Sequence, residues 1–188
     1  MSDVMTREQG IVLLQEHIKN PNMIKHCLAS EAVLGALAEH LGEDRGKWSM
    51  AGLLHDLDVE ITNADLRVHG LETVKILEGQ GMDPEIIEAI GLHNEKSAGK
   101  RRSTPFHHAL AAGETITGLI IATALVYPDK KIAGVKPKSI VKRMKEKAFA
   151  ASVDRDIIRE CELIPIPLNE FVGICLKAMQ SISDDLGL

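Results

Sequence analysis

The sequence predicts an all-α protein, and three of its features lead to that expectation. Aromatic residues make up only 3% of the 188 residues, whereas a β-sandwich is expected to be richer in Tyr, Phe, Trp and Thr. Hydrophobic residues reach 45%, and many of them are aliphatic residues that suit packed helices. Along much of the chain they recur three and four positions apart, which is the period of an amphipathic helix. We therefore expect a single domain over residues 1–188 with one substantial core.

The first two helices are marked by signals at their ends. Thr6 and Gln9 have the spacing of a capping box, and apolar residues follow at helical spacing until the dipeptide Asn20-Pro21 interrupts them. Apolar residues then form one stripe over residues 22–41, and Gly42 is a natural C-terminal stop.

A third helix is predicted from about Asp44, with Trp48 and His55 on the same side. Asp56, the next residue, is rotated by about 100° from His55 around an ideal helix. The side chains of His55 and Asp56 therefore reach one ion most easily if the helix ends or loosens at this point. The polar residues among 58–63 permit such an end.

Two helices are expected next, over about residues 67–78 and 84–93. His69 falls in the first turn of the former, and His93 lies on the apolar side of the latter, near its end. Asp83-Pro84 supplies an N-cap and a proline at the first helical position.

The longest apolar helix is expected from Thr104-Pro105 to Tyr127-Pro128, with Glu114 buried in its middle. The polar and cationic residues 94–103 before it are expected to form a mobile loop. Shorter helices are expected after it, near residues 139–149, 154–161 and 168–183. No linker separates these from the rest, so they should pack on the same core.

Charge is distributed unevenly along the chain. Residues 130–147 contain eight Lys or Arg and one Glu, which gives this stretch +7, whereas the net charge of the chain is -5 and the remainder is therefore -12. Such a stretch is either a solvated surface or a cationic rim that attracts a phosphorylated ligand. The negative net charge argues against specific binding of nucleic acid.

The cysteines and the hydropathy pattern indicate a cytoplasmic protein that does not enter a membrane. Cys27, Cys161 and Cys175 are far apart and form no CxxC, so neither a disulfide framework nor a zinc knuckle is expected. The N-terminal residues lack a basic segment followed by an apolar run, and the apolar segment 118–126 is too short to span a bilayer. A homodimer is compatible with the sequence.

The doublet His55-Asp56 and four residues around it are the best candidates for chemistry. With eight His and 11 Asp in the chain, one His-Asp dipeptide is expected roughly 0.5 times by chance, so its surroundings must carry the interpretation. Four other residues are predicted at or beside the apolar sides of helices: His26, His69, His93 and Glu114. A single such histidine is more often a hydrogen-bonded core residue than a ligand, but these positions recur together. Buried Glu114 also needs a counter-ion, a metal or a network of donors. One metal site would account for the carboxylate and the histidines together.

Imidazole and carboxylate groups without thiolate are typical ligands of Fe, Mn, Co, Ni and Zn, and less readily of Mg. A set rich in histidine favours a divalent transition metal, present as one or two ions.

The order of His26, His55-Asp56 and a later acidic residue resembles the HD-domain superfamily of metal-dependent phosphohydrolases, whose pattern is H…HD…D on a bundle of helices. Residues 51–56 are similar to the central signature of that family, and residues 115–119 to the helix after the last ligand in its small bacterial members. The resemblance covers about residues 20–127, the expected metal-binding core. A C-terminal helical extension follows at about 137–188.

The resemblance implies a ligand set and a reaction. One ion would be held by His26, His55, Asp56 and Glu114, and a second by Asp56, His69 and His93, with His108 as a further candidate ligand. A metal-activated water would then hydrolyse a nucleotide or another small phosphate ester. Asp56 and Asp58 are the expected catalytic residues, the latter orienting the water or passing on its proton. The cationic residues Lys96, Arg101 and Arg102 on the expected loop are candidates for holding substrate phosphates.

The chain departs from the family pattern at the last ligand, where Glu114 stands in place of the usual Asp. The carboxylate is kept on a side chain longer by one methylene, so geometry and metal preference are expected to differ, and loss of activity stays open. The alternative is then a non-catalytic module that senses a nucleotide or a metal. A purely structural helical protein with hydrogen-bonded histidines is a third interpretation and predicts no bound metal.

Overall fold

The computed structural model describes residues 5–188, and within that range the chain is helical, with turns between the helices and no β-strand. The expectation about the N-terminal segment rests partly on residues 1–4, which lie outside the described range. The helices follow one another as α1 (Arg7–His17), α2 (Pro21–Leu41), α3 (Arg45–Leu54), α4 (Leu71–Gly79), α5 (Pro84–His93), α6 (Glu95–Ala98), α7 (Pro105–Leu125), the 3-10 turn η1 (Ile132–Gly134), α8 (Pro137–Arg143), α9 (Arg155–Ile158), the 3-10 turn η2 (Arg159–Leu163), α10 (Leu168–Gln180) and α11 (Ser183–Leu186). The predicted all-α class is confirmed.

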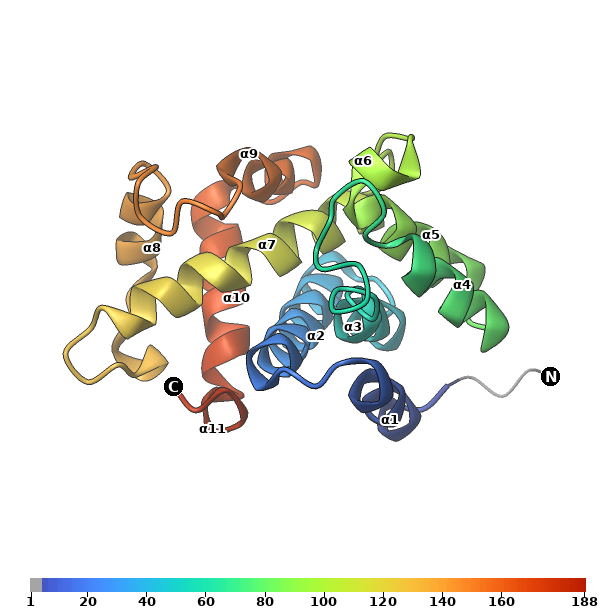
Figure 1. The fold of residues 1–188 in the computed structure, drawn as a ribbon. Coiled ribbons are helices and arrows are strands. Elements are labelled where there is room, and N and C mark those ends of the chain that lie inside the picture. Colours follow the sequence, from blue (N-terminus) through green and yellow to red (C-terminus); the bar gives the residue numbers. More distant parts are fainter. Residues whose placement is uncertain (1–4) are drawn as a thin grey trace.

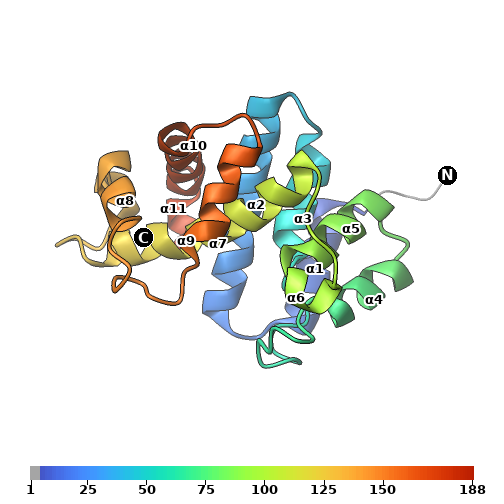
Figure 2. The same ribbon diagram turned by 90° about the horizontal axis from the view of Figure 1, so that it is seen from above.

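The two longest helices, α2 and α7, form the centre of the bundle (Figure 1). Helices α3, α4 and α5 gather toward one end of α7 and α8 lies at the other, with α9 and α10 between them, as the view from above also shows (Figure 2). One continuous cluster of buried apolar side chains extends from Leu13 in α1 to Leu186 in α11. The C-terminal helices therefore pack on the same core as the rest, as predicted.

Several helix ends follow the signals in the sequence. The capping box between Thr6 and Gln9 is formed, and Gly42 ends α2 in the left-handed region with φ 74°. Asp44 and Asp83 cap α3 and α5 through their side chains. Local chemistry therefore fixes these boundaries.

Helix α7 is, among residues 5–188, the one helix long and apolar enough to cross a membrane. Its apolar length exceeds the segment 118–126 considered from the sequence, because helicity continues from Pro105 to Leu125. Most of its side chains are buried against α2, α5, α10 and the turns around α9. This burial within the bundle accounts for the apolar composition, as in the central helix of a soluble protein.

Three expected boundaries are wrong. Helix α4 begins only at Leu71, so His69 precedes it, because Gly70 adopts the left-handed region with φ 96°. The segment 94–103, expected as a mobile loop, contains α6 and is tied to the core by the buried side chain of Arg102. Helix α8 ends at Arg143, before the expected 149.

The turns after α8 have their own support, which explains why the helix does not continue. The guanidinium of Arg155 donates hydrogen bonds to the carbonyl oxygens of Ala150 and Val153, both at 2.6 Å, and to that of Phe149. Backbone carbonyls held by a side chain in this way do not need helical partners.

Helices α2 and α3 share the most extensive contact in the bundle, and Gly52 of α3 lies directly against the backbone of α2. A Cβ atom added at Gly52 would lie 2.5 Å from the carbonyl oxygen of Ser30 and 2.7 Å from its carbonyl carbon. Both are backbone atoms, so neither can move aside without shifting α2. The absence of a side chain at this position therefore sets the separation of the two helices.

Replacing Gly52 by Ala should push α3 away from α2. We expect Gly52→Ala to lower the free energy of unfolding by about 1–3 kcal/mol, the usual cost of overpacking a well-packed core. Gly79→Ala is the matched control, because nothing lies within 4 Å of a Cβ at that position in α4. Urea denaturation of both variants measures the difference. Equal stability of the two would show that the contact at Gly52 is not restrictive.

Candidate metal centre

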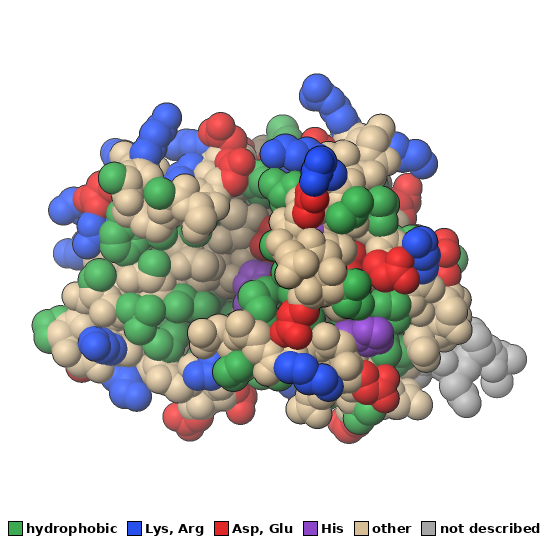
Figure 3. All heavy atoms as spheres, viewed as in Figure 1, with side chains coloured by type: hydrophobic (Ala, Val, Ile, Leu, Met, Phe, Trp, Pro, Cys, Tyr) green, Lys and Arg blue, Asp and Glu red, His purple; other side chains and the backbone are tan. Residues whose placement is uncertain are grey.

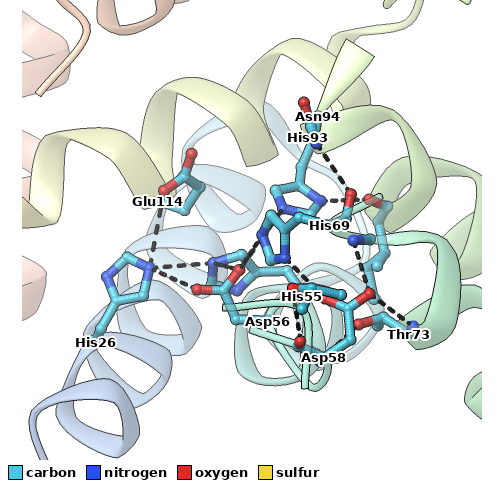
Figure 4. A network of polar contacts seen from close by, with 12 residues as sticks. His26, His55, Asp56, Asp58, His69, Thr73, His93, Asn94 and Glu114 are labelled. Carbon is cyan, nitrogen blue, oxygen red and sulfur yellow. Dashed lines mark hydrogen bonds and ion pairs between the residues drawn. The ribbon is translucent and has the colours of Figure 1, made fainter. Parts of the chain in front are cut away.

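Six side chains from separate segments of the chain converge beside α2 and α3 (Figure 4). They form two groups, in each of which the potential ligand atoms all lie within 4.8 Å of one another. The first group is His26, His55 and Glu114, and the second is Asp56, His69 and His93. These are the six residues predicted as ligands from the sequence, and the structure brings them together.

The carboxylate of Asp56 belongs to the second group but also lies close to the histidines of the first. Its Oδ2 is 3.5 Å from Nε2 of His26, and its Oδ1 is 3.4 Å from Nε2 of His55. The same Oδ1 is 3.0 Å from Nε2 of His69 and 3.6 Å from Nε2 of His93. Asp56 reaches both groups because α3 ends just before it, as the sequence suggested.

The imidazole Nε2 atoms face one another within each group. Those of His26 and His55 are 3.1 Å apart, and those of His69 and His93 are 3.0 Å apart. The carboxylate of Glu114 approaches from α7, with Oε2 3.8 Å from Nε2 of His26. Imidazole and carboxylate groups thus surround a common centre.

Backbone carbonyls fix the tautomers of two of these histidines. Nδ1 of His55 lies 2.9 Å from the carbonyl oxygen of Gly52, and Nδ1 of His93 lies 2.5 Å from that of Ile90. A carbonyl oxygen only accepts, so each Nδ1 must carry the hydrogen. In the neutral imidazole this leaves the Nε2 lone pair directed at the centre.

The tautomer of His26 follows from Thr117, one turn after Glu114 on α7. The hydroxyl of Thr117 donates to the carbonyl oxygen of Glu114 at 2.7 Å, so it can only accept from Nδ1 of His26 at 2.9 Å. His69 is fixed in the same sense, because its Nδ1 lies 2.7 Å from the Oδ1 of Asp58, a carboxylate acceptor.

When all four imidazoles are neutral, their Nε2 lone pairs and the two carboxylates are directed at one centre and repel each other unless a metal ion or a proton lies between them. Hydrogen bonds to the outer nitrogen of each ring are typical of histidines that bind a metal. The ligand types suit a transition metal ion better than Mg²⁺, which prefers oxygen. The residues present therefore fit a divalent transition metal ion.

The charges of the site are consistent with this. Burial lowers the pKa of His55 to about 3, against the opposing charge of Asp56, so its imidazole is neutral. Burial also raises the pKa of Glu114, against the opposing charges of His26 and His93. A cation would relieve the desolvated carboxylate of Glu114.

His69 behaves differently because it lies between two carboxylates. Burial by itself would lower its pKa, but hydrogen bonds and charges from Asp56 and Asp58 outweigh that effect and raise it to about 10. Without a metal, His69 is therefore a cation that joins the two aspartates. A metal ion bound at Nε2 must displace that proton.

Asp58 is not placed for the proton-relay role expected from the sequence. Its buried carboxylate accepts hydrogen bonds from His69 and from the backbone N–H groups of Gly70, Glu72 and Thr73, at 2.7 to 3.2 Å. It therefore caps the N-terminus of α4 and orients His69. We correct its role from catalytic to positioning.

Two further expectations need correction. His108, a further candidate ligand, lies outside both groups, with its Nδ1 2.7 Å from Glu160. Arg102, expected to hold substrate, has a side chain only 5% exposed and pairs with the same glutamate. Lys96 and Arg101 are exposed on and after α6.

Three positioning residues were missed by the sequence analysis. Thr117 holds His26, Gly52 holds His55, and Asn94 donates to the carbonyl oxygens of Leu66 and His69 at 2.8 and 2.9 Å. Thr117 was within a segment singled out by resemblance, and its place one turn after Glu114 was the available signal. Gly52 lies one turn before His55, whereas only the fold brings Asn94 to its partners.

Comparisons with known proteins place these residues in a family pattern. The family described as HD domain matches residues 23–125. Two proteins named ribonuclease Y, from the DP4 and Hildenborough strains of Nitratidesulfovibrio vulgaris, are each 32% identical to the chain over 97 residues. That segment is 52% of this chain and only 18% of each relative. No solved structure matches the chain significantly.

Substituting Asp58 should weaken metal binding without touching a ligand. In Asp58→Asn one acceptor oxygen becomes a donor, so we expect metal affinity about 10–100-fold lower and unfolding free energy about 1–3 kcal/mol lower. Asp65→Asn is the control, since that carboxylate pairs with exposed Arg67. Competition with a chromophoric chelator measures affinity. Equal affinities in the two variants would argue against the orienting role.

The pKa of His69 predicts how the stability of the metal-free protein depends on pH. Because the folded-state pKa of about 10 exceeds the ordinary 6.5, protonated His69 contributes its full stabilisation below about pH 6.5, and this is lost as pH rises through 10. The free energy of unfolding should fall over that window in the wild type, and less in His69→Gln. Identical pH profiles for the two proteins would contradict the assignment.

Proposed function

Because the chain belongs to the HD-domain family, we propose that it is a metal-dependent phosphohydrolase that acts on a nucleotide or another small phosphate ester. HD domains are generally enzymes of that kind. The convergence of four oriented imidazoles and two carboxylates is the observation that carries the proposal.

The six ligands would divide between two ions. His26, His55 and Glu114 would hold one, His69 and His93 would hold the other, and Asp56 would contribute to both. A divalent transition metal ion such as Fe, Mn, Co, Ni or Zn, when bound, lowers the pKa of a water molecule and offsets negative charge on a phosphate. Asp58 and Thr117 keep the ring nitrogens aimed at the centre.

The substrate would reach the centre from the side of His26 and Glu114. Their side chains are 19% and 18% exposed, whereas those of Asp56 and His93 are 8% and 5% exposed. Figure 3 shows a histidine on the floor of a hollow in the surface, open to solvent. This exposure favours the approach of a phosphate to the first group.

Cationic side chains on the same face of the molecule suit an anionic substrate. Figure 3 shows Lys and Arg side chains gathered over the part of the surface formed by α8 and its neighbouring turns. Within the described part of the chain, six exposed lysines of that stretch make no ion pair: Lys130, Lys131, Lys136, Lys138, Lys145 and Lys147. Such a surface would raise the local concentration of a phosphorylated compound.

A short oligoribonucleotide is an alternative substrate within the same chemistry. The matched relatives are named ribonuclease Y, and hydrolysis of a phosphodiester would use the same ligands. The lysines near α8 also favour a substrate with more than one phosphate. Turnover can be compared for phosphomonoesters, cyclic or linear diesters and oligoribonucleotides. The class that gives product fastest identifies the substrate.

A non-catalytic sensor is the second candidate function, and Glu114 is the residue that favours it. This glutamate stands where the family pattern has Asp, so the first group differs from that of catalytic members. Tight, saturable binding of a nucleotide to the metal-loaded protein, with no product on any substrate tested, would support the sensor over the enzyme.

The enzyme proposal is tested by removing a ligand. We expect His55→Ala and Asp56→Ala to lose most of the bound metal and to reduce turnover at least about 100-fold, because direct ligands matter more than the groups that orient them. His40→Ala is the control, since His40 is exposed and pairs with Glu170 outside both groups. Elemental analysis after anaerobic purification and a phosphatase panel with added Mn, Fe, Co and Ni are the measurements. Unchanged metal content and turnover in both ligand variants would overturn the proposal.

A further inference from the structure

The guanidinium of Arg102 is a buried junction between three parts of the chain. Its Nη1 donates to the carbonyl oxygens of Leu92 and His93, at 2.9 and 3.0 Å. Its Nε and Nη2 donate to the two carboxylate oxygens of Glu160, at 2.7 and 2.6 Å. The side chain is only 5% exposed, so solvent does not compete for these contacts.

The two carbonyls belong to the last turn of α5, where helix geometry leaves the C=O groups without partners. A cation at a helix C-terminus also interacts favourably with the helix dipole. His93 is the last residue of α5, and its Nδ1 is held by Ile90 in the same turn. The position of the His93 ring therefore depends on how this turn is held.

Glu160 holds Arg102 from a part of the chain outside the family match. It lies in η2, whereas the HD-domain match ends at residue 125. Burial opposes ionisation of Glu160, but hydrogen bonds from Arg102 and His108 outweigh it and hold the pKa of the carboxyl below its ordinary value. The carboxylate is thus charged and matches the buried guanidinium in a two-pronged pair.

We propose that Arg102 and Glu160 are positioning residues for His93, and that through them the C-terminal extension controls metal binding by the group of Asp56, His69 and His93. Removing either partner leaves the other buried charge with a weaker partner, which is Glu95 at 3.7 Å for Arg102 and His108 for Glu160, and this disturbs the end of α5. The inference rests on the proposed metal centre, but it does not require that the protein be catalytic. It also gives Arg102 and His108 a role in place of those first expected.

The test uses the full chain, with Glu160→Gln and Arg102→Lys as variants. Each keeps the size of the side chain and loses either the charge or the fork of donors. We expect Zn²⁺ to bind the group containing His93 about 10–100-fold more weakly than in the wild type. The group containing His26 should retain its affinity. Glu162→Gln and Arg101→Lys are matched controls, because both are exposed neighbours of the substituted residues.

Nitrogen-15 signals of the histidine rings report each group separately during a Zn²⁺ titration. In the metal-free variants the His93 signals should shift while those of His26 stay unchanged, a difference that general loss of stability would not give. Unchanged His93 signals and unchanged Zn²⁺ affinity in both variants would overturn the proposal.

A double variant keeps the test decisive if a single one fails to fold. In Arg102→Met with Glu160→Met no buried charge is left alone, so this protein should fold and still show the shifted His93 signals. Signals like those of the wild type in the double variant would contradict the inference. If the wild type itself bound no Zn²⁺, the proposed function would fail, whereas the His93 signals of metal-free protein would still decide the positioning role.

Discussion

The contact between α2 and α3 at Gly52 is the constraint on which the candidate metal centre depends. Ser30, which Gly52 touches, lies one turn after His26 on α2, and His55 lies one turn after Gly52. The contact of Gly52 with Ser30 is therefore one helical turn from the pair of imidazoles. The carbonyl of Gly52 also accepts the hydrogen bond from His55. One residue without a side chain thus sets both the distance and the tautomer.

The carboxylate of Asp58 has two roles, because it caps helix α4 and also orients a residue of the candidate metal centre. The backbone N–H groups at the start of α4 and the ring of His69 share its carboxylate. Since Gly70 takes a left-handed conformation directly before the helix, His69 can turn back toward Asp56 while α4 leads away. The start of α4 and the orientation of the His69 ring are therefore held by the same carboxylate, so a change in one would change the other.

The sequence was most informative where the controlling contacts are local. Helix ends at Gly42 and Asp83, and the approach of His55 and Asp56 to one centre, follow from caps and periodicity over a few residues. The six candidate ligands were predicted from spacing together with family resemblance, and the structure brings their side chains together. The start of α4 was misplaced because its cap comes from Asp58, more than ten residues earlier. The role of Arg102 was missed because its partner lies 58 positions away. Such pairs leave no periodic trace in the sequence.

The unequal exposure of the two ligand groups has a kinetic consequence. The side chains of His26 and Glu114 reach solvent, whereas those of Asp56, His69 and His93 are almost fully covered. If each group binds an ion as proposed, the one at the outer position would be exchanged by chelators while the bundle stays closed, whereas the inner one would leave only when neighbouring backbone opens. Dialysis would then strip the protein in two stages, and samples with half the full complement of ions would persist as a stable species.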